Sequence, residues 1–181
     1  MVRESKKRFS DLKIFQGDVR DLSVFAEGSF DFVLFSFNGL DTLVHADRIK
    51  SLQEIKRVLK PGGCFAFSSH HRGWSRFDRP FPWQQKFEFN MNFIKHYLKV
   101  IINLPQINAK RKSNIYAEDY AIILDGTHFF SLYNYYINPS DQTKQLQKNG
   151  FENVVCLNVN GKVISEDKTA EFLYYFCRKA G

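Results

Sequence analysis

The chain has 181 residues, of which 44% are hydrophobic and 25% are charged, a balance that is typical of one folded domain and excludes a disordered or fibrous chain. Its longest apolar stretch, residues 30–40, is shorter than the roughly 20 residues that a membrane-spanning helix needs. Residues 1–10 contain no hydrophobic signal region. We therefore expect a cytoplasmic protein with no membrane partner. The net charge of +7 suits an acidic partner, but the basic residues are scattered, so nucleic acid is the weaker alternative.

The sequence indicates no disulfide framework and no metal site. The three cysteines, Cys64, Cys156 and Cys177, stand far apart, without a CxxC motif or a cluster with histidine. No pair of His, Asp or Glu has metal-ligand spacing, so we expect no metal. Nineteen Phe, eight Tyr and two Trp exceed what a core of this size needs, so some aromatic side chains should line a pocket or a partner surface.

The first half of the chain predicts a strand–helix–strand unit. Residues 13–17 form a short apolar run that stops at Gly-Asp, and residues 31–37 are apolar on both faces, as in a parallel sheet covered by helices. Between residues 47 and 59 the apolar positions recur every three or four residues, which predicts an amphipathic helix. Lys-Pro-Gly-Gly at 60–63 ends it, and residues 64–69 resume as a strand. Such a unit is right-handed.

Residues 70–137 are too many for a simple connection and predict a cap-like insertion. Within it, a stripe of polar positions opposite apolar ones over residues 85–103 predicts a helix of about five turns. Residues 108–119 are polar and basic, which favours a loop. Residues 128–137 are aromatic with alternating faces, which predicts a strand.

The last part of the chain predicts one helix and two strands. Asn138-Pro139 is a typical helix start, Asn149-Gly150 a typical stop, and residues 151–159 and 171–178 read as strands. The sequence has no internal repeat and no linker. We therefore expect one domain over residues 1–181 with an insertion at about 70–137.

The order of four motifs resembles the second half of a class I S-adenosylmethionine-dependent methyltransferase domain. These motifs are GDVRDL, GSFDFVLFSFNGLD, EIKRVLKPGG and CFAFSS. The resemblance covers residues 10–69 well and 138–178 more weakly. It implies an α/β fold with a Rossmann-like, mostly parallel sheet, an antiparallel last strand and helices on both faces. It also implies S-adenosylmethionine as the cofactor.

Two parts of the family's pattern have no counterpart before Asp18. They are the first strand with its glycine-rich turn, which holds the cofactor's methionine end, and the acidic residue after the second strand. The family's strand order, 3-2-1-4-5-7-6, would place both missing strands between residues 13–17 and 31–37. We therefore expect a truncated domain in which residues 13–17 pair with residues 31–37 or fray. Cofactor binding by this chain alone should be weak or absent.

The resemblance also implies four cofactor-binding residues. The carboxylate of Asp18 would accept a hydrogen bond from the adenine amine, and the backbone amide of Val19 would meet the ring. A turn-capping role for Asp18 is the alternative. Phe37 and Asn38 end a central strand at the carboxyl edge of the sheet, where α/β proteins bind ligands. They are expected to line the methyl-transfer site.

Five further residues are candidates for catalysis or substrate binding. His70 and His71 follow the next strand and could act as a base or orient a nucleophile, although loop histidines without such a role are common. Trp74, Tyr133 and Tyr135 could wall a substrate pocket. Simple packing of the insertion on the sheet is the alternative for these aromatic residues.

Three functional hypotheses follow. The leading one is methyl transfer to an unidentified acceptor, most simply a small molecule, although this chain alone could be inactive. The second is a non-catalytic interaction module whose exposed sheet edges pair with another chain or with a second copy. The third is an RNA methyltransferase, suggested by the net charge and by Lys110-Arg111-Lys112.

Overall fold

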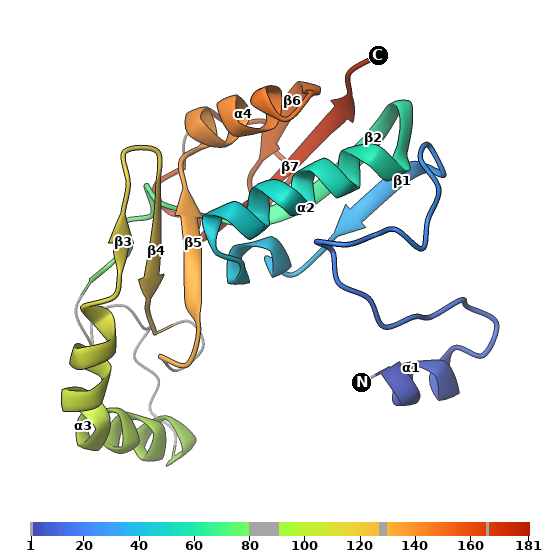
Figure 1. The fold of residues 1–181 in the computed structure, drawn as a ribbon. Helices are drawn as coiled ribbons and strands as arrows, with labels where there is room; N and C mark the ends of the chain where they lie inside the picture. Colours follow the sequence, from blue (N-terminus) through green and yellow to red (C-terminus); the bar gives the residue numbers. More distant parts are fainter. Residues whose placement is uncertain (1, 80–90, 127–129, 166) are drawn as a thin grey trace.

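The computed structural model describes residues 2–79, 91–126, 130–165 and 167–181. It contains one seven-stranded sheet with helices (Figure 1). The strands are β1 (Phe30–Phe35), β2 (Leu59–His71), β3 (Ile115–Tyr116), β4 (Tyr120–Leu124), β5 (Tyr133–Ile137), β6 (Phe151–Leu157) and β7 (Phe172–Lys179). The helices are α1 (Val2–Arg8), the 3-10 helix η1 (Gly39–Thr42), α2 (His45–Val58), α3 (Met91–Arg111) and α4 (Pro139–Lys148).

The long strand β2 organises the sheet. The strand order is β3-β4-β5-β2-β7-β6, and β1 also pairs with β2. Along one edge, the 13-residue β2 has two parallel partners, with β1 reaching Phe67 and β5 pairing with His70 and His71. Strand β7 runs antiparallel along the other edge. The chain that leaves β1 forms η1, which contacts both β5 and β2. The carboxyl ends of β1 and β2 therefore meet η1 and β5.

The α/β class, the parallel β1–α2–β2 unit and the antiparallel last strand are confirmed. The expectation of a mostly parallel sheet is wrong in one respect, because four of the six strand pairings are antiparallel. The insertion causes two of these four, since β3, β4 and β5 are joined as antiparallel neighbours. Strand β4 was not expected at all, although its sequence YAIIL is a short apolar run.

Other expected boundaries differ from the structure. Of the two outcomes expected for residues 13–17, the structure shows fraying and not pairing with residues 31–37: they form no strand, Phe15 is 67% exposed, and within the described chain β1 pairs only with β2. The insertion helix continues to Arg111, past the Pro105 inside it, so the expected loop 108–119 begins as helix and then contains β3. The expected helix residues 85–90 and strand residues 128–129 lie outside the described residues. Strand β5 begins at Tyr133.

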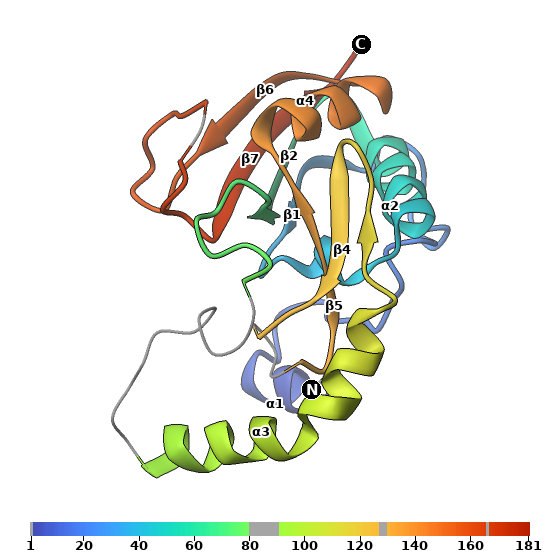
Figure 2. The ribbon, with the colours of Figure 1, turned by 90° about the vertical axis from the view of Figure 1, so that its left-hand side faces the viewer.

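Helices α2 and α4 lie on one face of the sheet (Figures 1 and 2). The apolar spacing on α2 buries Leu52 and Ile55 against Phe65 and Phe67 of β2, and Leu173 of β7 belongs to the same cluster. Helix α3 forms a smaller cluster with β4 at one end of the sheet. In the part of the chain that the structure describes, no helix is long and apolar enough to span a membrane.

The opposite face of β1 and β7 is open to solvent. Alternate residues point to this face, and Phe32, Leu34, Tyr174 and Phe176 are all exposed. Leu34 pairs with Ala66, which pairs with Phe176, so these residues form one row across three strands. The expected helices on both faces are thus found on only one face of these strands, as far as the described residues go.

We predict that two strand leucines respond very differently to truncation. Leu173→Ala, at 0% exposure, should lower the free energy of unfolding by about 2–5 kcal/mol because it leaves a cavity in the core. Leu34→Ala, at 61% exposure, should change it by less than about 0.5 kcal/mol. Chemical denaturation of both variants checks this, and equal losses would show that the open face is covered in solution.

Candidate functional site

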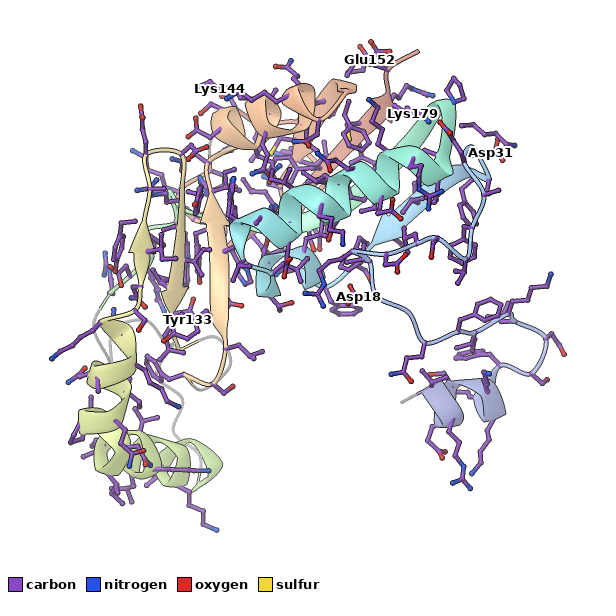
Figure 3. The ribbon with its side chains drawn as sticks, in the orientation of Figure 1. Asp18, Asp31, Tyr133, Lys144, Glu152 and Lys179 are labelled. Atoms are coloured by element: carbon purple, nitrogen blue, oxygen red, sulfur yellow. The ribbon has the colours of Figure 1, made fainter. Side chains whose placement is uncertain are left out.

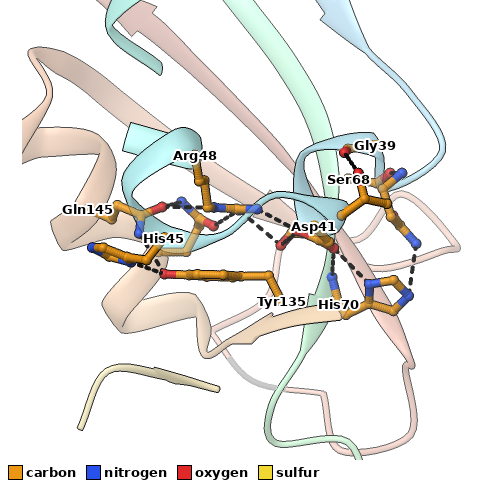
Figure 4. A network of polar contacts seen from close by, with 12 residues as sticks. Gly39, Asp41, His45, Arg48, Ser68, His70, Tyr135 and Gln145 are labelled. Atoms are coloured by element: carbon orange, nitrogen blue, oxygen red, sulfur yellow. Dashed lines mark hydrogen bonds and ion pairs between the residues drawn. The ribbon is translucent and has the colours of Figure 1, made fainter. Parts of the chain in front are cut away.

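Asp41 of η1 is the centre of a buried polar network at the carboxyl end of β2 (Figure 4). Its Oδ1 accepts hydrogen bonds from Nη1 of Arg48 (2.6 Å) and Oγ of Ser69 (2.7 Å). Its Oδ2 accepts one from the backbone N–H of His70 (2.6 Å) and lies 2.8 Å from Nδ1 of the same residue. None of these four residues is more than 2% exposed. The carboxylate is therefore buried and held by hydrogen bonds to both of its oxygens.

Arg48 connects this network to the rest of the fold. Its guanidinium donates to the side-chain oxygens of Gln142 (2.8 Å) and Gln145 (3.1 Å) on α4, and to Ser69 (3.1 Å). The same group lies 4.4 Å from the ring centre of Tyr135. A buried charge is tolerated only when it is paired and hydrogen-bonded, and Arg48 meets both conditions.

The ring of His70 faces Asn38 on its other side. Its Nε2 lies 3.4 Å from Nδ2 of Asn38, whose backbone N–H donates to Oγ of Ser68 (3.0 Å). The ring centre of Tyr136 is 5.0 Å from that of His70. Two side chains from the ends of β1 and β2 therefore meet here, where an open α/β sheet binds its ligands.

The charges around His70 favour its protonated form. Burial lowers the pKa of His70, but the hydrogen bond to Asp41 and the charges of Asp41, Asp125 and Glu171 outweigh it, so the pKa lies above the usual 6.5. For Asp41, burial raises the pKa, but the charge of Arg48 and the contacts with His70 outweigh it and the pKa is lowered. The two shifts thus favour a protonated imidazole beside an ionised carboxylate.

The turn that presents Asn38 is strained. Phe37 and Asn38 have positive φ angles of 58° and 52°, which are uncommon for residues other than glycine and cluster at functional sites. At Gly39 a Cβ atom would lie 2.4 Å from the ring of Phe35, so only glycine fits without a shift. The side chain of Phe37 is 96% exposed and contributes nothing to the network.

An apolar pocket of about 390 Å³ lies beside β1. Its lining residues come from the segment before β1, from β1 itself and from α2; they are Gly17, Asp18, Val19, Leu22, Phe25, Phe30, Phe32, Val33, Phe35, Ile55 and Val58. Both oxygens of the Asp18 carboxylate accept hydrogen bonds from Arg20 (2.6–3.1 Å), which lowers the pKa of Asp18 to about 2. The pocket therefore suits a flat, mostly apolar ring. Asp18 and Val19 line it, whereas Phe37 and Asn38 do not.

A second, more polar cavity of about 650 Å³ lies at the carboxyl ends of β2 and β5. Its lining includes His71, Gly73, Phe77, Asn138 and Ser140. Because neighbouring strand residues point to opposite faces, His71 does not join the network of His70. Its Nδ1 lies 3.0 Å from the backbone oxygen of Asp167. The two candidate histidines thus serve different sites.

Two of the three candidate aromatic residues lie together, because Tyr133 packs against the cluster that contains Tyr135, and Trp74 is not a member of that cluster. Tyr135 is buried, and its hydroxyl lies 2.9 Å from Nδ1 of His45, so it packs within the network. The hydroxyl of Tyr133 donates to the backbone oxygen of Lys110 (2.8 Å), beside α3 (Figure 3). Trp74 is half-buried in the turn after β2, but Phe77 lines the cavity there.

Sequence reasoning missed Asp41, Arg48, Gln142 and Gln145. One signal was present, because Arg48 stands four residues before Leu52 and so shares the buried stripe of α2. A charged residue in such a stripe needs a buried partner. Among the described residues, no three His, Cys, Asp or Glu side chains come close enough to hold a metal ion.

Comparisons with known proteins agree with this fold. A family model described as "Methyltransferase domain" matches residues 1–67. The chain is similar in structure to an S-adenosylmethionine-dependent methyltransferase from Thermotoga maritima (TM-score 0.57, 17% identity, 99% of this chain and 69% of that one). It is also similar to one from Clostridium acetobutylicum (TM-score 0.56, 15% identity, 98% and 70%).

A third similar structure is the 1,6-didemethyltoxoflavin-N1-methyltransferase of Burkholderia thailandensis, with bound 1,6-didemethyltoxoflavin and S-adenosylhomocysteine (TM-score 0.54, 13% identity). The alignment covers 99% of this chain but only 56% of that enzyme. A comparison with curated proteins finds no match. The match over residues 1–67 and the shared fold together confirm the resemblance to the class I S-adenosylmethionine-dependent methyltransferases.

Proposed function

We propose that the chain acts in S-adenosylmethionine-dependent methyl transfer to a small-molecule acceptor, with His70 as the acid–base group. The observation that carries this proposal is the buried contact of His70 with Asp41 on one side and Asn38 on the other. An acid–base histidine needs such an orienting partner. The small heterocycle bound by the Burkholderia enzyme supports an acceptor of that size.

The described residues fit one end of the cofactor. The resemblance places the adenine ring at Asp18 and Val19, and both residues line the apolar pocket, whose volume of about 390 Å³ admits a purine. The adenine amine would share the Asp18 carboxylate with Arg20. Among the residues that line this pocket, none is a cation that could pair with the carboxylate of the methionine end. Binding should therefore be weak.

His70 and Asn38 supply the acceptor side of the reaction. When bound, the cofactor supplies an activated methyl group to the nucleophilic atom of the acceptor. Nε2 of His70 takes the proton that this atom loses, and Asp41 offsets the charge that appears on the ring. Burial of the network keeps water away from this proton transfer and strengthens the interaction.

The pocket beside β1 predicts the outcome of a binding experiment. Phe32→Lys should weaken the binding of S-adenosylhomocysteine at least about tenfold, since a charged chain replaces an apolar wall. Leu34→Lys is the matched control, because Leu34 is exposed on the same strand but does not line the pocket. Calorimetric titration measures both. Absence of any heat with the unmodified chain at high concentration would contradict a cofactor site.

The two histidines should differ in catalysis. His70→Gln should lower the rate of S-adenosylhomocysteine formation by about 10²-fold or more, the usual contribution of an acid–base group, with unchanged cofactor affinity. His71→Gln should leave a rate close to normal because His71 faces another cavity. The assay offers S-adenosylmethionine and a panel of small amines and alcohols. A larger loss in the His71 variant would reverse the assignment.

A second candidate function is association through β1. Within the described residues this strand pairs only with β2, and its Phe32 and Leu34 are exposed. An unpaired, apolar strand edge is a template for pairing with another strand. We propose self-association at this edge as the alternative role of the chain.

Light scattering tests this alternative. The purified chain should form dimers at high protein concentration, and Leu34→Lys, which places a charge on the exposed side of β1, should shift it toward the monomer. A monomer at all concentrations would contradict pairing through β1. An RNA acceptor stays a prediction from composition.

A further inference from the structure

We infer that Asp41 is the positioning residue for His70, and that the centre they form with Asn38 takes an acceptor that donates an N–H or O–H hydrogen. The inference rests on the proposed function. It adds how Asp41 fixes the orientation and the tautomer of the ring, and it adds a chemical class for the methyl acceptor.

The contact with Asp41 fixes both the orientation of the His70 ring and its tautomer. A single oxygen, Oδ2, lies 2.6 Å from the backbone nitrogen and 2.8 Å from Nδ1 of His70. An ionised carboxylate only accepts hydrogen bonds, so Nδ1 must carry the proton. In the neutral ring Nε2 then carries no proton and can only accept, and its neighbour is Nδ2 of Asn38 at 3.4 Å, a long contact.

The Asp41 carboxylate itself cannot turn away. Its other oxygen, Oδ1, is held by Nη1 of Arg48 (2.6 Å) and Oγ of Ser69 (2.7 Å). Arg48 is in turn fixed by two glutamines of α4. Charged hydrogen bonds in a buried site are strong and directional. The fixed position of the carboxylate therefore fixes the orientation of the histidine ring.

The atoms that face the acceptor are themselves hydrogen-bond acceptors. The lone pair of Nε2 in the neutral His70 has only the long 3.4 Å contact with Nδ2 of Asn38, and Oδ1 of Asn38 is buried with no partner among the described residues. A group that satisfies them must donate hydrogen, as an amine or a hydroxyl does and a carbon or thioether does not. This distinguishes the acceptor class.

These groups account for the proton and for each bond that forms or breaks in the methyl transfer. The nucleophilic nitrogen or oxygen loses its proton to Nε2, and its electron pair forms the new bond to the methyl carbon. The methyl–sulfur bond breaks, and its electron pair stays on sulfur. The ring of His70 becomes an imidazolium whose charge Asp41 offsets, and the proton later leaves to solvent.

The charges around His70 give the reaction a defined pH dependence. The groups that face the ring are Asp41 from η1, Arg48 from α2, Asp125 after β4, Tyr136 from β5 and Glu171 before β7. Their net effect raises the pKa of His70 above 6.5, against the effect of burial. A base works only when deprotonated, so the rate should rise with pH through a value above 6.5. Without the charge of Asp41, burial should dominate and move this value below 6.5.

Nuclear magnetic resonance of the imidazole nitrogens tests the geometry without any acceptor. In the unmodified chain, with His70 assigned by comparison with His70→Gln, we expect a proton on Nδ1 above the pKa and a pKa above 6.5. In Asp41→Asn the pKa should fall below 6.5. Asp31→Asn is the matched control, since Asp31 is an exposed carboxylate on β1, and it should leave His70 unchanged. If Asp41→Asn does not fold, the unmodified chain alone decides: a proton on Nε2 or a pKa below 6.5 would overturn the role of Asp41.

Kinetics then test the acceptor class. The acid limb of the rate profile should follow the pKa measured for His70 and shift downward in Asp41→Asn, with a maximal rate lower by about 10-fold to 100-fold. Amines and alcohols should be methylated, and thioethers and carbon acids should not. Methylation of carbon acids alone would overturn the acceptor class. A chain with the expected His70 titration but no methyl transfer would refute the proposed function, whereas active enzyme with an unperturbed His70 would refute only the inference about Asp41.

Discussion

The buried ion pair of Asp41 with Arg48 is the interaction on which the site depends. It joins η1, α2, α4 and the end of β2 through hydrogen bonds that leave neither charge unpartnered. Such a pair adds little net stability, because desolvation offsets most of the attraction. Loss of one partner, however, would leave a buried charge and cost about 3–5 kcal/mol. The pair therefore acts mainly by specifying one arrangement of these four elements.

The geometry of β2 explains why this arrangement is needed. One edge of β2 pairs first with β1 and then, further along, with β5. The chain must therefore turn away from β2 at the end of β1, so that β5 can pair there. The positive φ angles of Phe37 and Asn38 and the crowded Gly39 accomplish this exit. The strain places η1, and with it Asp41, at the point where the two parallel strands separate. Strain of this kind persists only when surrounding contacts overdetermine it, and the ion pair provides those contacts.

The sequence predicted the elements that have a periodic apolar pattern, and it missed the buried polar network. The apolar period of α2 located the β1–α2–β2 unit because hydrophobic burial there follows secondary-structure spacing. The expected stop at residues 60–63 is wrong, because α2 ends at Val58 and these residues lie inside β2. Residues 13–17 form no strand, as the expectation of fraying allowed, because an apolar run forms a strand only beside a partner strand. Asp41 and Arg48 are seven residues apart in the sequence, and Gln142 and Gln145 follow nearly a hundred residues after Arg48. Such a network depends on tertiary contacts that no local pattern encodes.

The two proposed roles of β1 are physically linked. Phe32, Val33 and Phe35 line the apolar pocket, and the free edge of the same strand, within the described chain, is the surface on which another strand would pair. A strand added there would become a wall of the pocket. Any partner that improves the pocket in this way must raise cofactor affinity by the same factor by which the cofactor raises affinity for the partner. If a strand paired at this edge changes the pocket, association and cofactor binding at β1 are coupled, and each changes the affinity of the other by the same factor.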